Sequence, residues 1–125
     1  MKTILLVLST TTFLLGQPDF SSVITAIKVG NISQISSFMD KNVEVTVEEK
    51  DGSYSKTEAT NVVKTFLSKN APSNCTMIHS GAARDGASYY CIGNLSAGGN
   101  KFRIYIFFKK IGLNYLIQEM RFEED

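Results

Sequence analysis

The sequence contains no tryptophan, only one histidine, two cysteines and two prolines in 125 residues. Its charges nearly cancel, because 13 Lys and Arg residues are balanced by 12 Asp and Glu residues, and the basic residues are scattered along the chain. Nucleic-acid binding draws on clustered Lys and Arg, so no nucleic-acid partner is expected. One histidine and two separated cysteines are too few for a zinc site, which needs three or four ligands, so no metal is expected.

The motifs of nucleotide-binding proteins and of serine hydrolases are also missing. The chain has no Gly-x-Gly-x-x-Gly or P-loop sequence and no nucleophile elbow, and no cofactor is expected. Its length and ordinary apolar content predict one globular domain over residues 17–125.

Residues 1–16 have the pattern of a signal peptide. Lys2 precedes an apolar run that ends before Gly16 and is shorter than the ~20 residues that span a bilayer. The polar switch at Gln17 predicts cleavage near Gly16 and export to the periplasm or out of the cell. No cysteine follows the run, so no membrane anchor is expected after cleavage. The alternative is an uncleaved interfacial or buried N-terminal helix.

Helical periodicity dominates the beginning of the mature chain. Asp19 is expected to cap a helix that ends at Gly30. Asn31 is expected to cap a short second helix whose apolar side runs to Met39. A capping box at residues 55–58 predicts a third helix, which stops before Pro72.

Strict alternation predicts the first strand, at residues 43–47, followed by a turn at residues 50–52. The rest of the chain predicts a meander of four strands, at residues 74–83, 88–97, 101–110 and 113–123. The order helix, helix, strand, helix and four strands predicts an α+β fold. In it, three helices pack on one face of a curved, mostly antiparallel sheet of about five strands.

The two cysteines are predicted to be free and buried. A turn at residues 85–86 places Ser80 opposite Cys91 and Ser96 opposite Cys75. The sulfurs are then about five residues apart along the strands, too far for the ~7 Å limit on the Cα separation in a disulfide.

The candidate functional residues lie on the predicted strands. His79 alternates with Cys75 and Met77, and the same register places Tyr90 on the face of His79. His79 with Tyr90 or Tyr105 could supply acid–base chemistry. The preferred interpretation is a structural imidazole that satisfies one hydrogen bond.

A wider set of side chains is suited to ligand binding. Glu119 with Arg103 or Arg121 is interpreted as a surface ion pair. Aromatic residues occur on both faces of the predicted sheet, so the face without helices is either covered by a partner, as in a homodimer, or partly open. The candidate ligand-binding residues are His79, Tyr90, Arg103, Tyr105 and Gln118.

The order of elements resembles the nuclear-transport-factor-two-like, or cystatin-like, α+β cone superfamily. The sequence also resembles a family of small exported, uncharacterised proteins from Bacteroidota, in segments 26–31, 54–56, 79–81, 90–93, 102–105 and 115–118. The resemblance implies a fold and export but no reaction, because the superfamily includes isomerases, dehydratases, carriers and dimerisation modules.

The leading hypothesis is a non-enzymatic module that binds a small apolar ligand or a protein, with a modest pocket between helices and sheet. The alternative is an isomerase- or dehydratase-like enzyme with a His/Tyr pocket in the cone.

Overall fold

The computed structural model describes residues 17–125, so the predicted signal peptide lies outside the described residues. Within that range the chain forms one mixed sheet and three helices, none of which is long and apolar enough to cross a membrane. The elements in chain order are α1 (Phe20–Val29), α2 (Ile32–Ser37), β1 (Met39–Val47), β2 (Lys50–Ser55), α3 (Lys56–Lys69), β3 (Pro72–Ala82), β4 (Ser88–Ala97), β5 (Asn100–Ile111) and β6 (Asn114–Glu124).

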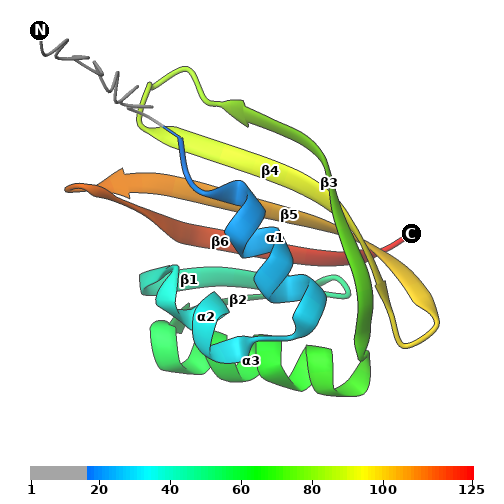
Figure 1. Cartoon of the computed structure of the whole chain (residues 1–125). Helices are drawn as coiled ribbons and strands as arrows, with labels where there is room; N and C mark the ends of the chain where they lie inside the picture. Colours follow the sequence, from blue (N-terminus) through cyan, green and yellow to red (C-terminus); the bar gives the residue numbers. More distant parts are fainter. Residues whose placement is uncertain (1–16) are drawn as a thin grey trace, which may run out of the picture.

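The strands lie in the order β2-β1-β6-β5-β4-β3 (Figure 1). The meander from β3 to β6 is antiparallel as predicted, and β1 joins its end by pairing in parallel with β6. The α+β prediction is therefore confirmed, but the sheet has six strands within the described residues and not about five.

The missed strand is β2, because the turn before it lacks the usual turn residues. The β1–β2 hairpin turns at Glu48 and Glu49, which have φ values of 48° and 70°. Two-residue hairpin turns of this kind favour Asn and Gly, so Asp51 and Gly52 were wrongly predicted as the turn. These two residues belong to β2, where Asp51 accepts a hydrogen bond of 2.6 Å from the Thr46 hydroxyl.

The helix ends follow the predicted capping residues. The Asp19 carboxylate accepts a hydrogen bond from the Ser22 N–H, and Gly30 ends α1 with a left-handed φ of 68°. The Ser55 hydroxyl accepts a hydrogen bond of 3.3 Å from the backbone N–H of Glu58 at the start of α3.

The second helix is shorter than predicted. It ends at Ser37, and the predicted helical residue Met39 is the first residue of β1. The Phe38 carbonyl accepts a hydrogen bond of 2.7 Å from the Ile117 N–H, and Met39 lies beside Ile117 of β6. Pairing with β6 therefore begins where the apolar spacing alone would continue the helix.

A bulge in β3 changes the predicted register of the β3–β4 hairpin. Ser80 lies opposite Cys91 as predicted, but Cys75 lies opposite Leu95 and not Ser96. The extra residue is Ile78, between the Met77 and His79 pairs. The bulge reverses the alternation of β3 at this point, as bulges do.

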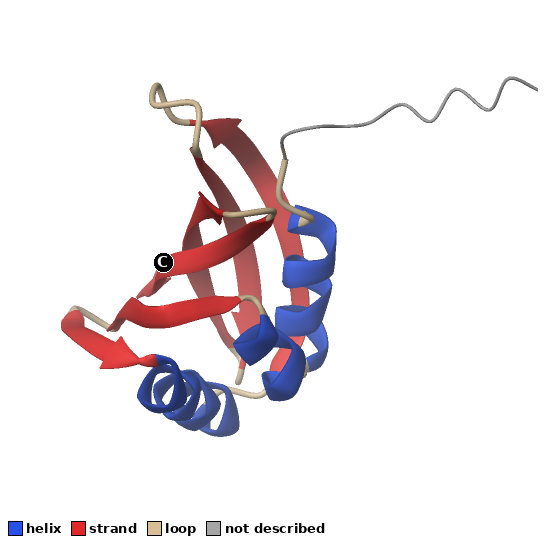
Figure 2. Ribbon diagram, turned by 90° about the vertical axis from the view of Figure 1, so that its left-hand side faces the viewer, coloured by secondary structure: helices blue, strands red, loops and turns tan. Residues whose placement is uncertain are grey.

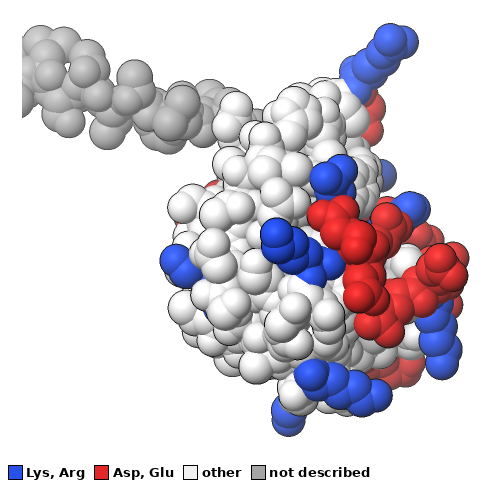
Figure 3. Space-filling view, turned by 90° about the vertical axis from the view of Figure 1, so that its right-hand side faces the viewer, with Lys and Arg blue, Asp and Glu red and all other residues white. Residues whose placement is uncertain are grey.

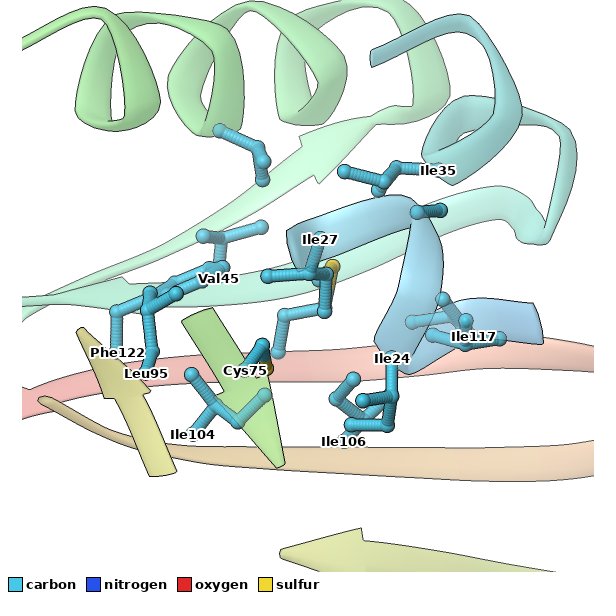
Figure 4. Close-up of a cluster of buried hydrophobic side chains, with 14 of the residues drawn as sticks. Ile24, Ile27, Ile35, Val45, Cys75, Leu95, Ile104, Ile106, Ile117 and Phe122 are labelled. Carbon is cyan, nitrogen blue, oxygen red and sulfur yellow. The ribbon is translucent and has the colours of Figure 1, made fainter. Parts of the chain in front are cut away.

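One face of the sheet carries the helices, and the core fills the space between them (Figure 2). Aliphatic side chains from α1, β1, β4, β5 and β6 point toward one another there (Figure 4). Cys75 and Cys91 belong to this core, and both are free thiols, as predicted. Burial raises the pKa of the Cys75 thiol to about 11 and that of Cys91 to about 12, so both remain protonated and unreactive at neutral pH.

Candidate binding site on the outer face of the sheet

The face of the sheet that carries no helices, called the outer face here, is lined by aromatic side chains. On β5, Ile104 and Ile106 are buried in the core, and Tyr105 and Phe107 alternate with them on the outer face. Tyr90 of β4 lies opposite Phe107 and points to the same side. These three aromatic side chains are half-buried, so they offer apolar surface to a partner.

A row of side chains crosses the outer face from β3 to β6. His79 Nε2 lies 2.9 Å from the Tyr90 hydroxyl, and the Tyr90 and Tyr105 rings are stacked with centroids 6.2 Å apart. The guanidinium carbon of Arg121 lies 5.9 Å from the centroid of the Tyr105 ring, a cation–π distance. The predicted catalytic candidates therefore lie together, in a row of exposed and half-buried residues.

The bulge in β3 explains which neighbours His79 has. Before the bulge, Cys75 points into the core, whereas His79 after the bulge lies opposite Ile92 on the outer face. The prediction that His79 shares a face with Tyr90 is confirmed, and the prediction that it shares one with Cys75 is wrong. No glycine marks the bulge in the sequence of residues 76–80.

The Tyr90 ring packs directly over Gly81. A methyl group on Gly81 would lie 2.8 Å from the Tyr90 hydroxyl oxygen and 2.9 Å from the ring carbon that carries it. Tyr90 therefore lies over the bare backbone of the edge strand and reaches His79. A glycine inside a strand pattern is a sequence signal of such close approach.

The β1–β6 side of the outer face is acidic. The Arg121 guanidinium donates to the Glu119 carboxylate at 2.8 Å, which confirms the predicted surface ion pair. Glu44 lies beside Glu119 on the neighbouring parallel strand. The pKa of Glu44 is raised, first by a hydrogen bond shared with Glu119 and then by the negative charge of that group. This pair was not predicted, because nothing local indicates that β1 pairs with β6.

We expect Glu44→Gln to stabilise the protein at neutral pH. The folded state holds the Glu44 proton more tightly than the unfolded chain does. The protonated carboxyl therefore stabilises the folded state below the ordinary pKa of 4.5, and this stabilisation is lost as pH rises through the raised pKa. Removing the like-charge pair should raise the free energy of unfolding by about 0.5 kcal/mol at neutral pH, a small gain because the pair is exposed. Urea unfolding over a pH series measures it. An equal gain at acidic and neutral pH would contradict the shared-proton pair.

Two hollows mark the outer face. One, of about 350 Å³, is lined by Tyr105, Arg103 and Glu123 among others, and Arg103 lies opposite Glu123 across the β5–β6 ladder. The second, of about 440 Å³, is bordered by Gln118, whose side-chain amide donates to Asp40 at 2.9 Å. Four of the five predicted ligand-binding residues therefore lie on the outer face, and Gln118 lies at its margin.

Burial raises the pKa of Tyr105, and the negative charge of Glu119 adds to this effect. The Tyr105 phenol is therefore protonated at neutral pH and acts as a hydrogen-bond donor. No cluster of His, Cys, Asp and Glu suited to a metal ion occurs within residues 17–125.

A separate groove of about 660 Å³ lies between α3 and the β1–β2 hairpin. Its apolar lining includes Val47, Tyr54 and Phe66, and Lys50 and Lys69 also border it. The groove lies between helix and sheet, where a pocket was predicted, but none of the predicted ligand-binding residues lines it. Binding of a small apolar ligand there stays a prediction.

The comparison with known proteins agrees with this architecture. The fold is that of the nuclear-transport-factor-two-like proteins: one such protein from Cytophaga hutchinsonii superposes with a TM-score of 0.63 at 12% identity, covering 84% of this chain and 91% of its own. The domain of unknown function DUF4783 matches residues 20–123, and the chain belongs to this family.

Solved members of the family are similar in both sequence and structure. A DUF4783 family protein from Bacteroides ovatus is 32% identical, with a TM-score of 0.81 over 88% of this chain and 98% of its own. One from Bacteroides uniformis is 26% identical, with a TM-score of 0.80 over 86% and 97%. No curated protein matches the chain. The resemblance to a Bacteroidota family is therefore confirmed, and the family carries no assigned activity.

Proposed function

We propose that the protein is a small exported, non-enzymatic interaction module that binds a second copy of itself through the outer face of the sheet. The observation that carries the proposal is the row of Tyr90, Tyr105 and Arg121, joined by Phe107. Aromatic residues and Arg are the side chains enriched at the centres of protein interfaces.

The charges of the outer face favour a second copy as the partner. Arg103 on β5 lies directly opposite Glu123 on β6. A two-fold axis along the strands, between β5 and β6, would place β5 of one copy over β6 of the other. Arg103 of each copy would then face Glu123 of its partner, so the same contact would form twice, as in an isologous dimer. Two sheets that pack face to face in this way align to within about 30°.

The same observations give less support to the isomerase- or dehydratase-like alternative. His79 is exposed, and its hydrogen bond to Tyr90 lies on the open side of the sheet. Acid–base catalysis gains most in a site that excludes water, and contacts between exposed groups are weak. An exposed His–Tyr pair beside an aromatic surface is better suited to a binding role.

Sedimentation velocity tests the dimer. We expect the wild-type protein to dimerise, and Tyr105→Asp to weaken the dimer at least tenfold, because it places a charge at the centre of the interface. Lys64→Glu, on the exposed side of α3, is the matched control and should dimerise like the wild type. A thermal melt of each variant checks folding. A wild-type protein that stays monomeric at every concentration would contradict the proposal.

Export is part of the proposal and has its own test. The basic start and the apolar run of residues 1–16 support a mature chain that begins near Gln17 in the periplasm or outside the cell. The intact mass of protein recovered outside the cytoplasm should lack residues 1–16. A mass that includes them would contradict cleavage.

A further inference from the structure

The turn between β5 and β6 exposes two aliphatic side chains at one end of the sheet. Leu113 is 94% exposed and Ile111 is 43% exposed. Gly112 takes the positive φ of 64° that the first position of this two-residue turn requires. The second position has no need of an aliphatic residue and usually carries a polar one, so the fold itself does not explain Leu113.

Basic and aromatic residues lie next to this apolar tip. Lys109 and Lys110 immediately precede Ile111, and both are exposed. Tyr115 lies opposite Lys110, and its ring packs edge-on against Tyr89 with centroids 5.3 Å apart. Apolar residues at the tip, with cations and a tyrosine pair beside them, match surfaces that rest in a bilayer interface, where phosphates bind the cations and aromatic rings lie at headgroup level.

The tip lies where the N-terminal segment joins the fold. A hollow of about 530 Å³ is lined by Gln17 and Pro18 on one side and by Leu113 and Leu116 on the other. Figure 1 shows the first described residues and the β5–β6 turn at the same end of the molecule. Before the proposed cleavage, an apolar leader at residues 1–16 would bring this end of the molecule to the membrane.

The opposite end of the molecule is acidic. Glu48, Glu49, Glu123 and Glu124 surround a hollow there, and acidic side chains gather on that end in Figure 3. The charge is thus unevenly distributed along the strands although the net charge is only +1. An anionic surface would repel the acidic end and would turn the Lys109–Lys110 end toward itself.

We propose that the β5–β6 tip rests on an anionic phospholipid surface, with Ile111 and Leu113 between the headgroups and Lys109 and Lys110 at the phosphates. A fluid bilayer surrounds a protruding side chain without needing a matching cavity, which suits a leucine that is 94% exposed. The contact is reversible and is not an anchor, because two side chains and two cations give only weak binding.

The chain has no tryptophan of its own, so the fluorescence of a single tryptophan introduced at the tip reports on the tip alone. We expect the emission of Leu113→Trp to shift to the blue with phosphatidylglycerol-containing vesicles and to be quenched by brominated lipid. Asn100→Trp, at the first residue of β5 and therefore at the other end of that strand, is the control and should show neither effect. If residues 1–16 were retained, both variants would bind vesicles through them. That binding alone would not bury the tryptophan at position 113 while leaving the one at position 100 exposed.

Vesicle partitioning supplies the second measurement. The double variant Ile111→Ser/Leu113→Ser should partition at least about tenfold more weakly than the wild type, and Lys109→Gln/Lys110→Gln should lose its preference for anionic over zwitterionic vesicles. An unshifted and unquenched Leu113→Trp spectrum, or serine variants that partition like the wild type, would overturn the proposal. Binding of the tip to a protein in place of lipid would give those same negative results.

Discussion

Phe122→Ala should lower the free energy of unfolding by about 4 kcal/mol. Phe122 is fully buried, and its ring lies 4.7 Å from that of Phe66, which in turn packs edge-on against Phe102 at 5.0 Å. This cluster joins α3 to the last two strands. The substitution therefore leaves a cavity, because residues on three separate elements would have to move together to fill it. The loss is a large part of the total stability of about 5–15 kcal/mol for a domain of this kind.

Urea unfolding measures this loss, and Phe122→Leu provides the control. Leucine keeps most of the buried volume, so it should cost only about 1.5 kcal/mol. A loss below about 1 kcal/mol for Phe122→Ala would contradict the position of Phe122 in the core.

Gly93→Ala should cost about 2 kcal/mol, the second largest effect. A methyl group at Gly93 would lie 2.9 Å from the backbone carbonyl oxygen of Thr76 and 3.1 Å from the Ile104 side chain. The carbonyl belongs to the paired neighbouring strand, so the two strands would have to separate.

Gly81→Ala is the matched control. A methyl group at Gly81 would lie 2.8 Å from its nearest neighbour, which is the hydroxyl of the half-buried Tyr90 ring. The ring can rotate away, so Gly81→Ala should cost less than about 1 kcal/mol, and it should weaken the proposed dimer by displacing Tyr90. Thermal or urea unfolding compares the two alanine variants, and equal costs would contradict this explanation.

Local signals were sufficient to predict most elements of the fold. Asp19, Gly30 and the capping box at residues 55–58 set helix ends whose hydrogen bonds involve residues close in sequence. The β4–β5 and β5–β6 hairpins follow from glycine-containing turns between alternating segments. Their predicted alternation was correct, but only the structure decides that Phe107 and not Phe108 lies on the outer face.

The remaining features depend on contacts that no local pattern records. The Glu48–Glu49 turn forms despite unfavourable residues, because β2 pairs along its whole length with β1. The parallel pairing of β1 with β6 joins segments more than seventy residues apart, as in Glu44 beside Glu119. The acidic side of the outer face was therefore not predictable, whereas the contact of His79 with Tyr90 was, because both belong to one hairpin.

The proposed dimer and the proposed lipid contact involve different parts of the molecule. The dimer uses the outer face, and the lipid contact uses the turn between β5 and β6. A two-fold axis along the strands would keep both tips of the dimer at the same end, so one surface could bind both. Two weak contacts on one assembly bind more strongly than either alone.

The most direct test of the central claim, that the outer face binds a second copy, exchanges charges across the two-fold axis. Arg103→Glu and Glu123→Lys each place like charges in both symmetric contacts, so each variant alone should sediment as a monomer. In an equimolar mixture every such contact joins opposite charges, and a heterodimer should form with about the wild-type affinity. The account predicts two monomeric variants and a dimeric mixture. A mixture that stays monomeric while the wild type dimerises, or single variants that dimerise like the wild type, would contradict it.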